Sequence, residues 1–214
     1  MSLAVEPTSS ASISGDSNPA TEIPFDWYYT FTGVDHDYRI GTFEITNAQW
    51  NRFTAALGVP LAGDPASAYD ASGYWTGDNV PVNNVSWYEA AQFVNWLNTS
   101  TGHHEAYKFT GTQGTSDYTL AAWTAAEGGT GKDLLRHEDA LYYLPNEDEW
   151  VKAAYWNGTS LQTYATKDGE TVFRGNGTDG GGTTPSTGTL APMGRRKARG
   201  TSAAAARNST GPTT

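Results

Sequence analysis

The sequence lacks cysteine, long apolar runs and an excess of basic charge. Without cysteine the chain can form no disulfide, thiolate metal site or cysteine nucleophile. No stretch approaches the ~20 apolar residues that a membrane-spanning helix needs. The first ten residues carry neither a basic segment nor a long apolar core, so no secretory signal is visible. The net charge of −10 argues against general binding to nucleic-acid phosphates.

Aromatic residues and glycine, by contrast, are plentiful. The 214 residues include 8 Trp, 12 Tyr and 7 Phe, and each aromatic side chain can remove about 150–250 Å² from water. The 24 glycines indicate many turns. This composition predicts a compact, loop-rich globular domain with aromatic packing.

Composition also divides the chain into segments. Residues 1–22 are rich in Ser, Thr, Ala and Pro, which predicts a flexible tail. We expect the folded domain to span 23–175, with a long polar insertion over 99–140 that holds one short hairpin or helix. Residues 176–214 have almost no large apolar side chains, so we predict a disordered Gly/Thr/Ala/Arg-rich tail. Its basic residues are Arg195, Arg196, Lys197, Arg199 and Arg207, and without interleaved aromatics they indicate a solvated tail rather than a nucleic-acid site.

Three segments begin with a polar residue followed three positions later by an acid or amide. This spacing predicts a capping box, in which the two side chains satisfy backbone donors at the start of a helix. The pairs are Thr46 with Gln49, Ser86 with Glu89, and Asn146 with Glu149.

Apolar residues at helical spacing follow each start. Trp50, Phe53 and Leu57 predict a helix over 47–57 that stops at Gly58. Upstream, alternating Tyr and Ile at 38–40 and the aromatic run DWYYTF predict short strands.

The second and third helices follow the same pattern. The second has four apolar residues along one side, and Asn98 is predicted to end it. The third is predicted to run to Gly158. The apolar residues of the second helix are Ala90, Phe93, Val94 and Leu97.

Three motifs occur in order: IGTFEITNAQW, VPVNNVSWYEAAQFVNWLN and YYLPNEDEWVKAAYW. Together they resemble the formylglycine-generating enzyme, or sulfatase-modifying-factor, family over roughly residues 35–175. Asn146 stands where that family usually has Thr or Ser, and Asn keeps the helix-capping role. The other matching residues are Glu44, Thr46, Asn47, Pro81, Val82, Ser86, Trp87, Ala90, Leu144, Pro145, Glu147, Glu149 and Trp150.

The resemblance implies a C-type-lectin-like α+β fold with much irregular structure. The insertion and the KAAYW ending resemble a bacterial, exported branch, which implies an extracellular location. Family members usually carry Gly-Asn-Val-x-Glu-Trp, Arg-Gly-Gly-Ser-[Trp/Phe] and Gly-Phe-Arg elements in their second half, and this sequence has none of them. We therefore expect a fold that is incomplete at its C-terminus.

The missing elements also bear on chemistry. In the oxidase of this family, the paired copper-binding cysteines and most calcium ligands lie in the second half. No catalytic, cofactor-binding or metal-binding residue can therefore be carried over to this chain. The Arg-, Ala-, Gly- and Thr-rich composition after Met193 is typical of GC-rich DNA read out of frame, which gives the hypothesis of a truncated or frameshifted member.

The acidic run Glu147, Asp148 and Glu149 invites a metal or acid–base site. Adjacent helical residues point about 100° apart, so the three carboxylates do not converge on one ion. Acids in the first turn of a helix are also stabilised by its dipole. We interpret the run as a helix start.

Two further sets of residues could bind metals. Zinc would need three of the four histidines to converge, and we expect these histidines to be solvent-exposed instead. For calcium, four oxygen-bearing residues precede the second helix without EF-hand spacing, and a turn-rich loop explains them equally well. The histidines are His36, His103, His104 and His137, and the oxygen-bearing residues are Asp70, Asp78, Asn79 and Asn83.

The tryptophans divide by position. We predict that Trp50, Trp87 and Trp150 belong to the core, because they lie in helix starts with apolar periodicity. Trp75 and Trp123 lie in predicted loops and are better candidates for exposed contacts.

These observations favour a non-catalytic binding or structural module. It would present loops 62–84 and 99–140 to a protein or glycan partner. One alternative is a formylglycine-generating-type oxidase or related metal-dependent enzyme, and another is a fragment without function.

Overall fold

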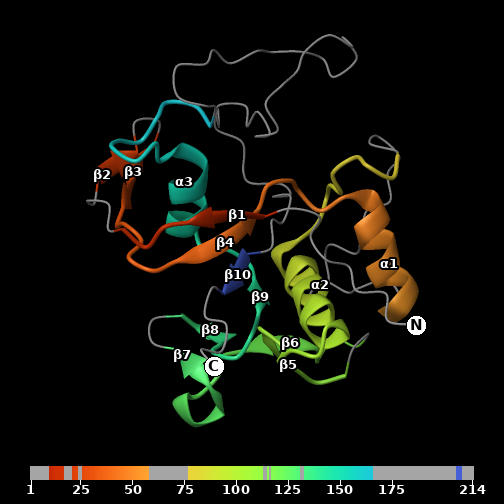
Figure 1. The fold of residues 1–214 in the computed structure, drawn as a ribbon. Helices are drawn as coiled ribbons and strands as arrows, with labels where there is room; N and C mark the ends of the chain where they lie inside the picture. The colour runs from red at the N-terminus through yellow and green to blue at the C-terminus, as the bar shows by residue number, and fades with distance from the viewer. Residues whose placement is uncertain are drawn as a thin grey trace, which may run out of the picture. The chain divides into compact units, whose positions relative to one another are not determined.

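A computed structural model describes residues 10–16, 21–23, 26–57, 77–112, 115, 117–130, 133–165 and 206–208. Helices are mixed with short strands (Figure 1), which confirms the α+β class. The described residues fall into two compact units: unit 1 contains 44–144 and 206–208, and unit 2 contains 10–43 and 145–165. None of the helices in these ranges is long and apolar enough to cross a membrane.

The described residues of unit 2 form two antiparallel strand pairs and one helix. Strand β1 (Ser10–Ile13) pairs with β4 (Tyr38–Gly41), and β2 (Thr21–Ile23) pairs with β3 (Asp26–Phe31). Helix α3 spans Glu147–Tyr155. The buried apolar residues of this unit are Phe31, Val34, Tyr38, Ile40, Val151 and Tyr155.

Strand β1 lies inside the segment 1–22 that we predicted to be a flexible tail, so that prediction is wrong for these four residues. Ser10 lies opposite Gly41, and Ile13 lies opposite Tyr38. Short polar strands carry little apolar signal, and the partner strand is distant in sequence. Composition alone therefore did not reveal the pairing.

The start of α3 follows the predicted capping box. The side-chain oxygen of Asn146 accepts a hydrogen bond from the backbone N–H of Glu149 at 2.8 Å, and Glu149 Oε2 accepts from the backbone N–H of Asn146 at 2.7 Å. The helix ends at Tyr155, earlier than the predicted Gly158. Trp156 adopts extended backbone angles and forms an antiparallel bridge with Leu161, which ends the helix.

Unit 1 is organised around helices α1 (Asn47–Leu57) and α2 (Trp87–Ser100). The predicted range 47–57 is confirmed. Trp50 stacks on Phe93 with ring centroids 5.5 Å apart, and Phe53 packs edge-on against the same ring at 5.5 Å. Leu57, which the helical spacing aligned with these residues, is 50% exposed instead.

Helix α2 lies in the middle of unit 1 and contacts α1 and β9 (Tyr142–Tyr143) (Figure 1). Ser86 and Glu89 form the predicted capping box. All residues from 89 to 98 are buried, so the helix is enclosed rather than buried along one face only. It does not end at Asn98 as predicted but continues to Ser100, and Asn98 itself is fully buried.

The insertion 99–140 is more ordered than the single hairpin or helix we predicted. Its described residues form two antiparallel hairpins and one short 3-10 helix. These elements are β5 (Lys108–Thr110) with β6 (Thr119–Ala121), η1 (Ala125–Glu127), and β7 (Gly129–Thr130) with β8 (Asp133–His137).

Strand β10 (Ala206–Asn208) pairs antiparallel with β9, inside the segment 176–214 that we predicted to be disordered. The prediction is therefore wrong for these three residues, whose backbone hydrogen bonding does not depend on apolar side chains. The predicted domain end at residue 175 lies outside the described residues. The C-type-lectin-like arrangement and the C-terminal incompleteness stay predictions.

Candidate functional site

The acidic run at the start of α3 does not form one site. Glu149 is buried with 1% of its surface exposed, whereas Glu147 is exposed. Asp148 accepts hydrogen bonds from the backbone N–H of Thr32, at 3.2 Å, and from the Thr32 hydroxyl. The carboxylates therefore serve different partners, as expected of a helix start.

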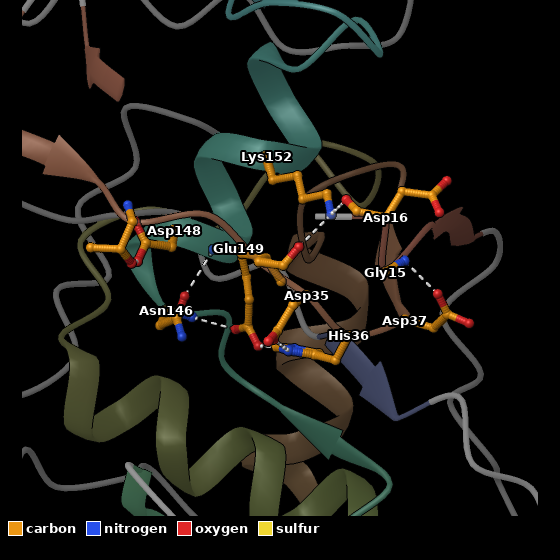
Figure 2. Close-up of polar contacts among 11 residues, drawn as sticks. Gly15, Asp16, Asp35, His36, Asp37, Asn146, Asp148, Glu149 and Lys152 are labelled. Atoms are coloured by element: carbon orange, nitrogen blue, oxygen red, sulfur yellow. Dashed lines mark hydrogen bonds and ion pairs between the residues drawn. The ribbon is translucent and has the colours of Figure 1, made fainter. Parts of the chain in front are cut away.

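Glu149 also binds His36 (Figure 2). Glu149 Oε1 lies 3.0 Å from His36 Nε2, and the imidazole is half exposed although the carboxylate is buried. In an active site a carboxylate of this kind orients a base. Here His36 Nδ1 lies 3.9 Å from the Asp35 carboxylate, so both ring nitrogens face acids. The pair can fasten the segment around His36 to α3.

Lys152, one turn further along α3, is a second buried polar anchor. Its ammonium donates to the backbone carbonyl of Val34 at 2.6 Å. It also donates to the backbone carbonyl of Asp16 at 2.9 Å (Figure 2). Burial lowers the pKa of Lys152, and the nearby carboxylates of Asp16, Asp35 and Asp37 oppose that shift. An amine held by two carbonyls in this way positions chain segments.

The contacts of Asp148, Glu149 and Lys152 on α3 hold neighbouring chain segments in place. Thr32, His36 and Lys152 each join α3 to the loop between β3 and β4 or to the residues after β1. Among the residues that the structure describes, no group of three or more His, Asp or Glu side chains is placed to hold a metal ion.

Unit 1 brings together two of the four histidines. The rings of His104 and His137 stack with centroids 3.5 Å apart and planes inclined by 12°. Trp123 packs edge-on against both rings, at 5.4 Å and 4.8 Å. His104 is exposed as predicted, but His137 is 8% exposed, so the expectation of solvent exposure is wrong for it.

The histidine stack, defined as His104, His137 and Trp123, is tied to the backbone at Ala106. The indole N–H of Trp123 and the backbone N–H of His137 both donate to the Ala106 carbonyl, each at 2.9 Å. Gly128 packs against the His137 ring, where an added Cβ would come within 2.5 Å. Three separate parts of the insertion therefore meet at one point.

A half-exposed aromatic group lies at the start of α2. Trp87 is 40% exposed, which contradicts the prediction that it belongs to the core. Its ring packs edge-on against Tyr107 at 5.1 Å and Tyr88 at 5.7 Å. We call these three residues the Trp87 surface. Because Trp87 follows the loop 77–84 and Tyr107 belongs to the insertion, this contact joins the two loops.

The other tryptophans also differ in burial. Trp50 is 1% exposed, which confirms its place in the core, and Trp150 is partly buried. Trp123, predicted to make exposed contacts, is partly buried in the histidine stack. Trp75 lies outside the described residues.

The loop before α2 uses its backbone to hold α1. The carbonyls of Asp78 and Val80 accept hydrogen bonds from Ala48 and Asn47 at the first turn of α1. Asp78 and Asn79 have exposed side chains, and Asn83 is partly buried. Asp70 lies outside the described residues, so calcium binding by this loop stays a prediction.

Sequence reasoning missed the histidine stack and the exposure of Trp87. His104 and His137 are separated by an irregular stretch of the insertion, and no spacing pattern connects them. The one local signal is Gly128, which has a φ of 87° and accommodates the buried ring.

Comparison with known proteins gives the family. The family model described as the sulfatase-modifying factor enzyme 1-like domain matches residues 30–203 and so continues past residue 175. Among solved structures, the Treponema denticola variable protein 1 is similar, with 21% sequence identity and a TM-score of 0.42. The similarity covers 71% of this chain and 53% of that one, so the chain spans about half its length. No curated protein matches. Because the family model matches most of the chain, this protein belongs to the sulfatase-modifying factor enzyme 1-like family.

Proposed function

We propose that this chain is a non-catalytic sulfatase-modifying-factor-like domain that binds a protein or glycan partner through the Trp87 surface. The observation that carries the proposal is the contact between Trp87 and Tyr107, which joins the loop before α2 to the insertion. A half-exposed tryptophan supported edge-on by two tyrosines offers a rigid apolar face with little entropy left to lose on binding.

The absence of cysteine supports a non-catalytic role. The oxidase of this family is expected to bind copper through paired cysteines, and this sequence contains none. Among the described residues of unit 2, the buried acidic and basic side chains, Glu149 and Lys152, are already engaged by backbone groups and His36. Their contacts support anchoring rather than turnover.

An oxidation assay tests the non-catalytic part. The full chain is incubated with copper and a peptide that carries the cysteine-containing sulfatase motif, and conversion to formylglycine is followed by mass spectrometry. We expect no conversion above the copper-only control. Turnover that depends on the protein would establish the oxidase alternative and overturn the proposal.

A binding screen tests the remaining part. Wild-type protein and Trp87→Ala are compared on a glycan array and against the same sulfatase-motif peptide. Leu57→Ala is the matched control, because Leu57 is also half exposed in unit 1 but lies on α1. We expect Trp87→Ala to lose binding that the control retains. Binding that both variants retain equally would show that the Trp87 surface is not the contact.

A further inference from the structure

The two stacked histidines have opposite hydrogen-bonding roles. His104 Nδ1 lies 2.8 Å from the carbonyl oxygen of Glu105, which can only accept, so this nitrogen carries a proton. His137 Nδ1 accepts from the backbone N–H of Asp139 at 3.1 Å, so this nitrogen presents its lone pair. In the folded protein His137 is therefore the neutral tautomer with its proton on Nε2.

Protonation affects the two rings differently. A proton on His104 goes to Nε2 and leaves the hydrogen bond to Glu105 intact. A proton on His137 must go to Nδ1, where it would face the N–H of Asp139 and break that hydrogen bond. When both rings are charged, two cations face each other with their centroids 3.5 Å apart, which is unfavourable even in a high dielectric.

The surrounding charges do not cancel this repulsion. Asp139 Oδ2 lies 4.0 Å from His137 Nδ1, and a protonated ring can pair with it only by leaving its present hydrogen bond. Glu127 is already paired with Lys108 at 2.5 Å, and this contact, with Thr124, lowers the pKa of Glu127 to about 2. Lys108 lies 5.6 Å from the Trp123 ring and adds positive charge. The other nearby acids, Glu105 and Glu138, are exposed on the loops beside the stack.

We propose that the His104–His137 stack is a pH-operated latch, which holds residues 103–106 against hairpin β7–β8 when neutral and releases them in mild acid. Histidine is the side chain that ordinarily changes charge between about pH 5 and 8. Release separates His104 from His137 and frees Trp123 and His137 from the Ala106 carbonyl they share. The proposal concerns the insertion itself and holds whether or not the Trp87 surface binds a partner.

Hydrogen exchange at the Trp123 indole N–H tests the latch in the full chain. Its resonance is assigned by its loss in Trp123→Phe. We expect local opening, corrected for the intrinsic pH dependence of exchange, to increase on the order of tenfold from neutral pH to about pH 5. The indole of Trp50, in the core of the same unit, reports global unfolding and should not change with it.

Two variants separate the stack from other titrating groups. His104→Phe keeps a ring on His137 but removes one of the two charges, so its opening should depend on pH less than that of the wild type, with only the hydrogen bond of His137 to Asp139 left to respond. His103→Asn removes the adjacent exposed histidine, which is outside the stack, and should behave like the wild type. Equal opening of the wild type at both pH values, a pH dependence in His104→Phe as large as that of the wild type, loss of the pH dependence in His103→Asn, or parallel exchange at Trp50 would each overturn the proposal.

Discussion

Replacing Asn98 by alanine removes three hydrogen bonds that join α2 to the chain at β9. The side-chain amide donates to the Tyr142 carbonyl at 2.8 Å. The side-chain oxygen accepts from the backbone N–H groups of Leu141, at 3.1 Å, and Tyr142, at 2.8 Å. Asn98 is fully buried, so water does not replace the amide without entering the core.

The size of the effect follows from these contacts. A hydrogen bond contributes about 1 kcal/mol net, and a buried group left without its partner costs about 1–3 kcal/mol. We expect Asn98→Ala to lower the free energy of unfolding by about 3–5 kcal/mol. For a domain of this size each kcal/mol lowers the melting temperature by about 2–4 °C, so the expected decrease is about 6–20 °C.

Urea unfolding followed by circular dichroism measures the change. Asn95→Ala is an intermediate comparison, because the Asn95 side chain makes two such hydrogen bonds rather than three. Both join it to the backbone of Tyr107, at 2.6 and 2.9 Å. Asn51→Ala, on the exposed face of α1, is the control and should change stability by less than about 0.5 kcal/mol. If Asn98→Ala cost no more than Asn51→Ala, the side-chain bridge to β9 would not hold the two elements together.

Three further predictions concern buried or constrained positions. Burial raises the pKa of Glu89, so the folded state binds a proton more tightly than the unfolded state does. Glu89→Gln should therefore raise the free energy of unfolding at neutral pH. In melting experiments at several pH values, the difference in stability between Glu89→Gln and the wild type should shrink as the pH falls toward 4.5. Gly128→Ala should destabilise more than Gly102→Ala in urea unfolding, because both glycines have positive φ but only the first has a ring, His137, in the way of a Cβ. Lys152→Met should lower the free energy of unfolding by about 1–3 kcal/mol, because two carbonyls lose their donor. Equal unfolding curves for the two glycine variants, or for Lys152→Met and the wild type, would contradict these expectations.

The helices were predictable from sequence because their start signals are local. Ser86 with Glu89 and Asn146 with Glu149 form the predicted capping boxes, and each box depends only on residues three positions apart. The helix ends were harder to predict. Asn98 is a common residue at helix ends, but here its amide is used by a strand more than forty residues away.

Strands and exposure depended on distant partners. Strand β1 has a polar sequence and pairs with β4 beyond β2 and β3, so no local pattern marks it. The burial of His137 is set by His104 and Trp123, neither of which is near it in sequence. Trp87 has the position of a core residue in the helical pattern, yet it lies at the first helical position, where neighbouring turns do not cover it.

The capping glutamates have a consequence for how this fold can vary. Three capping boxes contain a glutamate: Glu89, Glu127 and Glu149. In each box the Oε2 atom of the glutamate accepts a hydrogen bond from the backbone N–H of the capping residue, which leaves the Oε1 atom for a second contact. Oε1 of Glu149 contacts His36 and Oε1 of Glu127 contacts Lys108, whereas Oε1 of Glu89 has no hydrogen-bond partner among the residues that the structure describes. One oxygen thus sets where a helix begins, and the other selects which remote segment is attached there. A change in that remote segment can therefore alter the tertiary contacts of the domain while every helix still begins at the same residue.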